Sequence, residues 1–130
     1  MIAAVTDVLI DFLSAVERVA GQIAGYVAAD QLQTTAVTCF ELLSGAAEGK
    51  RGDAIRRLLA GLPVLPLDRD AAEYAAAVRR ELDRAGQTIG MADSLIAGIA
   101  LTHGVRLFSR NRKHFERVAD LKLVEVEDGR

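Results

Sequence analysis

Short apolar segments alternate with helix-like segments along almost the whole chain, and this alternation restricts the fold more than any other feature of the sequence. Residues 2–5, 32–37, 105–108 and 121–126 have the length and composition of buried strands. The segments between them carry apolar residues three or four positions apart, which is the spacing of an amphipathic helix. We therefore predict an α/β fold with four strands in a central, mostly parallel sheet that helices cover on both faces.

Two of the helical segments have clear signals at their ends. Residues 91–103 carry a strongly apolar stripe, and Gly104 stops the helix. A longer helix begins at Asp68 or Asp70 and stops at Gly86. The inner stripe of this longer helix is expected to consist of Ala71, Tyr74, Ala75, Val78, Leu82 and Ala85.

The middle of the chain gives shorter signals. Thr38 and Glu41 have the spacing of a capping box, so Glu41 is expected at the third position of a helix over residues 39–47. Residues 54–60 are expected to form the next short helix. Two prolines favour an extended connector over residues 62–67, because a residue before proline is pushed out of the helical region.

Polar residues follow the predicted strand ends at Val5, Val37 and Phe108. Ligands of parallel sheets bind beyond the carboxyl ends of the strands, so these polar residues are the candidates for chemistry. Together with an acid that enters from a helix start, they are Thr6, Asp7, Glu41, Asp93, Ser109 and Asn111.

Acidic residues make up half of this set. Three or four carboxylates from distant parts of the chain would suit Mg²⁺ or Mn²⁺, which prefer oxygen ligands, activate water and neutralise charge on a phosphate. Each acid also has a local alternative. Asp93 would stabilise the start of its helix through the helix dipole, and Glu41 would serve in the capping box. Asp7 would be an N-cap, and Asp11 a solvated helix acid.

Basic residues crowd the turn after residue 108. On their own they would form a solvated face, but beside an acidic site they would contact nucleic-acid phosphates without reading the sequence. These candidates for RNA contact are Arg110, Arg112, Lys113 and Arg117. His114, in the same turn, is more often a hydrogen-bonding histidine than a metal ligand, because a magnesium site has little use for imidazole.

Size and composition exclude several classes of protein. A chain of 130 residues with a net charge of −2 fits one domain over residues 1–130, without the basic coat of a dedicated nucleic-acid-binding protein. The sequence has neither an apolar run long enough to cross a membrane nor the cationic start of a signal peptide. The single cysteine, Cys39, cannot form an internal disulfide and is expected to be a small buried hydrophobe. We expect a soluble cytoplasmic protein.

Four motifs follow one another in a particular order. They are Val-Thr-Asp-Val-Leu-Ile-Asp at residues 5–11, Thr-Cys-Phe-Glu-Leu at 38–42, Ile-Gly-Met-Ala-Asp-Ser-Leu-Ile-Ala at 89–97 and Ser-Arg-Asn-Arg-Lys-His-Phe at 109–115. This series resembles the PIN-domain ribonucleases, specifically the VapC toxins of bacterial type II toxin–antitoxin modules. VapC chains commonly have Asp-Thr-Asn/Asp-x-Leu-Ile-Asp, a Thr/Ser-led Glu-Leu, Ile-Gly-x-x-Asp-x-x-Ile-Ala and Thr/Ser-x-Asn-x-x-Asp/His-Phe. Each motif alone is weak, but all four in order cover nearly the whole chain.

The resemblance implies a PIN-domain α/β/α sandwich and a magnesium- or manganese-dependent endoribonuclease. It implies that Glu41 and Asp93 are acidic site residues. It also implies that Ser109 and Asn111 organise a fourth corner, and that His114 occupies a position where the family has Asp or His. Family members usually form homodimers, and a small VapB-like antitoxin that also binds operator DNA holds them inactive.

Val5 departs from the family pattern, because VapC toxins have their first metal-binding Asp at this position. Valine offers no oxygen to a cation, so the activity of this copy is expected to be impaired. The chain is a natural degenerate copy, or carries a selected or engineered inactivating substitution, or rebuilds a weaker site with Asp7 and Asp11. The otherwise intact motif favours the second explanation.

Two other classes of protein share features with this chain. One is a non-catalytic PIN pseudo-enzyme that acts as an antitoxin-binding or regulatory module. The other is a phospho-acceptor receiver-like domain, which has the same alternation of strands and helices. A receiver needs paired acids directly after its first strand and a lysine after a late strand, and Val5 and Ser109 meet neither requirement.

Overall fold

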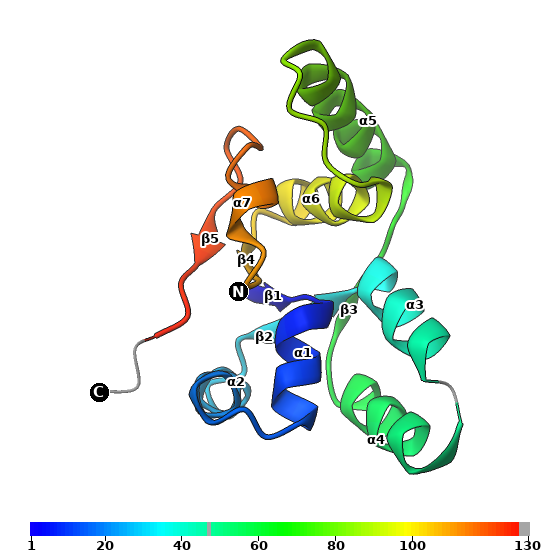
Figure 1. The fold of residues 1–130 in the computed structure, drawn as a ribbon, viewed down its shortest axis with the longest axis vertical. Coiled ribbons are helices and arrows are strands. Elements are labelled where there is room, and N and C mark those ends of the chain that lie inside the picture. Colours follow the sequence, from blue (N-terminus) through cyan, green and yellow to red (C-terminus); the bar gives the residue numbers. More distant parts are fainter. Residues whose placement is uncertain (47, 128–130) are drawn as a thin grey trace.

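A five-stranded sheet lies at the centre of the fold. The computed structural model describes residues 1–46 and 48–127. The strands are β1 (Ile2–Ala4), β2 (Leu32–Thr35), β3 (Val64–Leu65), β4 (Arg106–Phe108) and β5 (Leu123–Val124). They lie in the order β3-β2-β1-β4-β5, and all neighbours are parallel (Figure 1). The predicted α/β class with a parallel sheet is confirmed.

Helices cover both faces of this sheet. In chain order they are α1 (Thr6–Leu13), α2 (Glu17–Ala28), α3 (Ala36–Gly45), α4 (Gly49–Ala60), α5 (Arg69–Arg84), α6 (Met91–His103) and α7 (Arg112–Phe115). One face packs against α1, α2 and α4, and the other packs against α6 (Figure 1). In the part of the chain that the structure describes, every helix is too short or too polar to span a membrane.

β1 is buried on both faces because it lies in the middle of the sheet. Ile2 and Ala4 belong to the core under α1 and α2, whereas Ala3 belongs to the core under α6. Alternate residues of a strand point to opposite faces, so a strand of only three residues contributes to both cores.

Helix α5 lies outside α6, and the two helices approach closely at Gly98 (Figure 1). A Cβ atom at Gly98 would lie 2.5 Å from the carbonyl oxygen of Ala71 and 2.7 Å from the Cβ of Ala75. Small residues on both helices therefore set the distance between them. This packing also positions the first turn of α6, which carries Asp93.

The predicted start of α3 was wrong. β2 ends at Thr35 rather than Val37, and Thr35 is the N-cap, because its hydroxyl oxygen accepts a hydrogen bond from the backbone N–H of Thr38 at 3.0 Å. Glu41 consequently lies in the middle of the helix and not at its third position. The capping box failed because two threonines with cap-forming side chains lie three residues apart, and the earlier one caps the helix.

Two further local predictions differ from the structure. Residues 62–67 contain the short strand β3, which pairs with Thr34 and Thr35 at the edge of the sheet, where proline is tolerated. Tyr74 is 50% exposed, and Ala85 is exposed and lies just past the end of α5, so neither belongs to the inner stripe of this helix. The bounds of α6 and its stop at Gly104, which adopts a left-handed conformation with φ of 63°, agree with the prediction.

Candidate active site

A small cavity lies where the carboxyl ends of β1 and β4 meet. The two strands are paired in register at Ala4 and Phe108, so the residues that follow them emerge side by side. The first turn of α6 and the middle of α3 close the cavity, which has a volume of about 120 Å³. Its lining residues are Val5, Thr6, Asp7, Glu41, Asp93, Ile96, Ser109, Asn111 and Phe115. The structure thus brings together candidates that are far apart in the sequence.

Glu41 is oriented by the first residue of α1. The hydroxyl of Thr6 donates a hydrogen bond to Oε1 of Glu41 at 2.8 Å, between residues that are 35 positions apart. This contact fixes one carboxylate oxygen at the wall of the cavity. It also links α1 to α3, because each of the two residues belongs to one of these helices.

Asp93 forms a polar cluster with Asn111 and His114. Nδ1 of His114 lies 3.0 Å from Oδ2 of Asp93, and Nδ2 of Asn111 lies 3.5 Å from the same oxygen. Nδ2 of Asn111 also lies 3.0 Å from Nδ1 of His114. When Nδ1 carries a proton it donates to the carboxylate of Asp93, and when it carries none it accepts from the amide of Asn111. His114 is therefore a hydrogen-bonding partner of an acid.

Asp7 is not the N-cap of α1. Val5 holds that position and its side chain makes no capping bond, whereas Asp7 lies in the first turn. Oδ1 of Asp7 accepts a hydrogen bond from the backbone N–H of Val8 at 2.7 Å. Its Oδ2 accepts from the hydroxyl of Ser109 at 3.1 Å and from the backbone N–H of Arg110 at 2.9 Å. Both carboxylate oxygens are therefore engaged by protein groups.

Val5 makes one side of the cavity apolar. Its side chain is 5% exposed and belongs to the same hydrophobic core as Ile96 and Phe115, which also line the cavity. At residue 5, where the motif of the resembled family has an acid, the cavity that Glu41 and Asp93 line is therefore bordered by an apolar side chain. Valine at this place offers the cavity neither an oxygen ligand nor a negative charge.

The side chains at the cavity do not fit a tightly held divalent cation. Across residues 1–46 and 48–127, no group of three His, Cys, Asp or Glu side chains is placed to hold a metal ion. Glu41 and Asp93 offer oxygen ligands of the right kind, but the oxygens of Asp7 serve α1 and the loop after β4. The donor set therefore lacks the carboxylate that Val5 replaces.

Most of the predicted RNA-contact residues have protein partners. Arg110 forms an ion pair with Asp11, and the guanidinium of Arg117 donates a hydrogen bond to the carbonyl oxygen of Thr88 at 3.2 Å. Arg112 lies 3.3 Å from a carboxylate oxygen of Glu116 and 3.6 Å from one of Glu125. Lys113 is exposed, and its ammonium group makes no ion pair with any acid in the described part of the chain.

Cys39 lies two residues before Glu41 and is half-buried. Burial raises the pKa of its thiol above the ordinary value. Because a thiol must lose its proton to attack, Cys39 is not an activated nucleophile.

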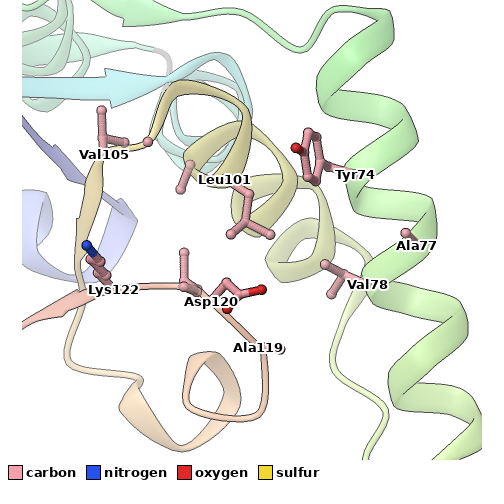
Figure 2. Close-up of a pocket in the computed structure, with 11 residues that line it drawn as sticks. Tyr74, Ala77, Val78, Leu101, Val105, Ala119, Asp120 and Lys122 are labelled. Atoms are coloured by element: carbon pink, nitrogen blue, oxygen red, sulfur yellow. The ribbon is translucent and has the colours of Figure 1, made fainter.

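A larger cavity of about 380 Å³ lies elsewhere, between α5, α6 and the segment that precedes β5. Figure 2 shows Tyr74 and Val78 reaching it from α5, Leu101 from α6, and Asp120 and Lys122 from that segment. Gly104 and Val105, just before β4, also line it, so it lies at the amino end of this strand. The candidate carboxylates are at the carboxyl end and do not reach this cavity.

Sequence reasoning missed the contacts of Thr6 and Asp11. Asp11 was expected to be solvated, but its side chain is only 13% exposed and binds Arg110. One signal was present in the sequence: Asp7 and Asp11 are four residues apart, which places them on the same side of a helix. Their partners, more than 95 residues away, had no comparable signal.

Residues 4–121 match the family model of the PIN domain, and the chain belongs to the PIN-domain family. Its relatives include VapC ribonucleases. The tRNA(fMet)-specific endonuclease VapC of Shigella flexneri is 33% identical over 92 residues, which cover 68% of this chain and 70% of the relative. Ribonuclease VapC11 of Mycobacterium tuberculosis is 40% identical over 74 residues, about half of each chain.

Several solved structures have the same fold. VapBC2 of Rickettsia felis, bound to a DNA fragment from its promoter, superposes with a TM-score of 0.82 at 22% identity, covering 95% of this chain and 98% of the other. FitAcB of Neisseria gonorrhoeae superposes with a TM-score of 0.78 at 27% identity, covering 96% and 97%. The low identity of the first comparison shows similarity of fold alone.

Proposed function

We propose that the chain is a VapC-type endoribonuclease toxin that hydrolyses phosphodiester bonds of RNA with a divalent metal ion, and that Val5 impairs this copy. Family membership and the ribonuclease names of the relatives support the activity. One structural observation carries the proposal: Glu41, Asp93 and Asn111 converge on one small cavity at the carboxyl edge of the sheet.

The proposed cofactor is Mg²⁺ or Mn²⁺, by resemblance to the family. Such an ion activates water and neutralises charge on a phosphate. We propose that a carboxylate at position 5, with Glu41 and Asp93, is required to hold it, and we assign no metal-assisted step to the chain with Val5. Thr6 would orient Glu41, and Asn111 and His114 would orient Asp93.

Lys113 is the proposed contact to the RNA backbone. It is exposed on α7, one residue from His114, and the structure gives it no acidic partner in the described residues. The other three basic residues make contacts within the protein, so they would first have to exchange these partners. A single lysine acts on phosphate as a point charge and would not select a sequence.

We also propose that two copies associate through an apolar patch next to the cavity. Phe40 is 70% exposed and Met91 is 65% exposed, unusually high fractions for large apolar side chains. The patch, hereafter the α3–α6 patch, consists of Ala36, Val37, Phe40, Leu67, Met91, Ala92 and Leu95. Glu41 and Asp93 are on the same two helices, so a second copy seated here would bring two cavities close together.

A VapB-like antitoxin is the proposed inhibitor, and it would supply any binding to operator DNA. The VapBC and FitAcB complexes support this partner, since their toxin subunits share the fold of this chain. Toxin, antitoxin and RNA would meet in the cytoplasm. Co-purification of the chain with the product of a short adjacent reading frame would test the partnership.

The activity is tested by comparing RNA cleavage by the chain and by its Val5→Asp variant. With Mg²⁺ or Mn²⁺ present, we expect the variant to cleave at least roughly 100-fold faster, because a bound metal ion contributes several kcal/mol to such a reaction. Adding Glu41→Gln to the variant should abolish the gain. A folded Val5→Asp variant that leaves all RNA intact would contradict the ribonuclease assignment.

The alternative is a non-catalytic PIN pseudo-enzyme that acts as an antitoxin-binding or regulatory module. The missing third ligand among the described residues favours this alternative for the chain as it stands. The two proposals differ in the Val5→Asp variant. If the Val5→Asp variant cleaves RNA, the ribonuclease proposal is supported, because a single substitution then restores activity. If the variant binds an antitoxin but does not cleave RNA, the pseudo-enzyme is supported.

A further inference from the structure

The loop that follows β4 is held to α1 by an ion pair. The Nε of Arg110 donates to Oδ2 of Asp11 at 2.6 Å, and Nη2 donates to Oδ1 at 3.2 Å. This two-point arrangement fixes the guanidinium plane, which a single contact would leave free to rotate. Asp11 is 13% exposed and Arg110 is 52% exposed, so the pair lies at the rim of the site and not in the core.

A second set of bonds connects the same two segments one helical turn earlier. Oδ2 of Asp7 accepts from both the hydroxyl of Ser109 and the backbone N–H of Arg110. The Ser109 oxygen in turn accepts a hydrogen bond from the backbone N–H of Asn111 at 2.9 Å. Two acids on one side of α1 thus determine where the backbone of residues 109–111 lies.

The position of this loop matters because Asn111 lies at its end. The side chain of Asn111 reaches both Asp93 and His114. Asp7 and Asp11 do not contact Asp93 themselves. A series of hydrogen bonds connects α1 to Asp93: Asp7 binds Ser109, Ser109 binds the backbone of Asn111, and the side chain of Asn111 reaches Asp93. Groups that fix the orientation of site residues from behind commonly change activity by 10- to 100-fold.

We propose that Asp11 and Arg110 are positioning residues, which, together with Asp7, hold Asn111 and thereby Asp93 and His114 in the arrangement that RNA cleavage needs. Arg110 is thereby assigned to the protein and not to the RNA backbone. We refer to Asp7, Asp11 and Arg110 together as the α1 clasp. Its role in cleavage rests on the proposed ribonuclease function.

The kinetic test uses the Val5→Asp background. Asp11→Asn and Arg110→Gln should each lower kcat roughly 10-fold and leave KM for RNA unchanged, because a displaced loop affects the reacting geometry more than binding. The double variant should be no worse than either single variant, since both remove one interaction. Asp53→Asn, an exposed acid of α4, is the matched control and should leave kcat unchanged.

A direct RNA contact by Arg110 would give a different pattern. Arg110→Gln would then raise KM and flatten the salt dependence of binding, while Asp11→Asn would leave kcat intact by releasing the arginine for RNA. This result would overturn the proposal.

The clasp is also tested without any activity, in the chain with Val5. Hydrogen exchange at the backbone amides of Arg110 and Asn111 should accelerate roughly 10-fold or more in Asp11→Asn, while exchange of the core amide of Ile99 stays unchanged. Unchanged exchange at both loop amides would overturn the clasp. Faster exchange together with an inactive Val5→Asp variant would retain the clasp and refute the ribonuclease function.

Discussion

Val5 affects the electrostatics of the site as well as the number of oxygen atoms that the site could offer to a metal ion. Asp7, Glu41 and Asp93 already line the cavity, so in a chain with aspartate at position 5 four carboxylates would line it and repel one another without a cation. Valine reduces this repulsion and extends the hydrophobic core that includes Ile96 and Phe115. We therefore expect an aspartate at position 5 to favour metal binding and to lower the stability of the metal-free protein, and valine to do the opposite.

Val5→Asp should destabilise the protein in the presence of a chelator. A nearly unexposed carboxylate beside Glu41 and Asp93 should lower the melting temperature by roughly 5–10 °C, and added Mg²⁺ should recover much of the loss. Thermal unfolding followed by circular dichroism measures both effects. Val5→Asn is the matched control, because it has a similar shape without the charge and should gain little from Mg²⁺. Equal melting temperatures of chain and Val5→Asp variant in chelator would refute this reasoning.

Metal affinity should change in the opposite direction. Calorimetric titration with Mn²⁺ should show weak binding to the chain, and binding that is at least roughly 10-fold tighter in Val5→Asp, because one charged ligand contributes more than 1.4 kcal/mol. A Val5→Asp variant that binds Mn²⁺ no better than the chain would show that position 5 is not a ligand position.

The sequence could identify the acids of the site but not the partners of their oxygens. Residue type selected Glu41 and Asp93 as candidates, together with a predicted strand end at Val37 for Glu41 and a helix start for Asp93; the strand in fact ends at Thr35. The contacts of Asp7 and Asp11 depend on Ser109 and Arg110, which reach α1 only because β1 and β4 are neighbours. Four predicted strands allow several orders, so pairing across about a hundred residues had no local signal.

At the scale of secondary structure, α5 packs along α6 and approaches it closely at Gly98. The backbone of α5 at Ala71 and Ala75 lies where a side chain on residue 98 would be. Any larger residue must push α5 outward, since a backbone carbonyl cannot rotate away as a flexible side chain can.

Gly98→Ala should therefore destabilise the protein by about 1–3 kcal/mol, in spite of the better helix propensity of alanine. Gly21→Ala in α2 is the matched control. Its new Cβ atom would meet nothing within 4 Å, so this change should stabilise the protein by up to about 1 kcal/mol. Denaturant unfolding of both variants measures the difference, and equal stabilities would mean that α5 moves without cost.

The elements that were predicted correctly have strong local signals. α6 combines an apolar stripe with a glycine in the left-handed conformation at its end, and its bounds agreed with the prediction. β3 has two residues, too few for any periodicity, and pairing with β2 defines it. The start of α3 was missed because Thr35 and Thr38 are equally good caps in sequence, and only the end of β2 decides between them.

At the scale of the whole molecule, the α3–α6 patch is an almost wholly apolar surface that α3 and α6 leave open to solvent. Phe40 and Met91 project from helices that also carry site residues. Association through this patch would therefore be coupled to the geometry of the site.

Phe40→Asp should convert a dimer into a monomer, because a buried charge in an apolar interface costs more than the interface gains. Sedimentation velocity at several protein concentrations measures the state. Val27→Asp on α2, where the valine is 48% exposed, is the matched control and should keep the dimer. A chain that is already monomeric at high concentration would refute the proposed dimer.

The order of the strands has a consequence for biosynthesis. β1 is translated before the four strands that join it, yet it forms the middle of the sheet, and Ile2 pairs with both Leu32 and Arg106. Its second neighbour is translated about a hundred residues later, so the sheet cannot close until nearly the whole chain has emerged. Pairing across such a separation is slow and leaves apolar surface exposed in the meantime. The cavity, which residues after both β1 and β4 line, therefore cannot assemble before β4 has been translated.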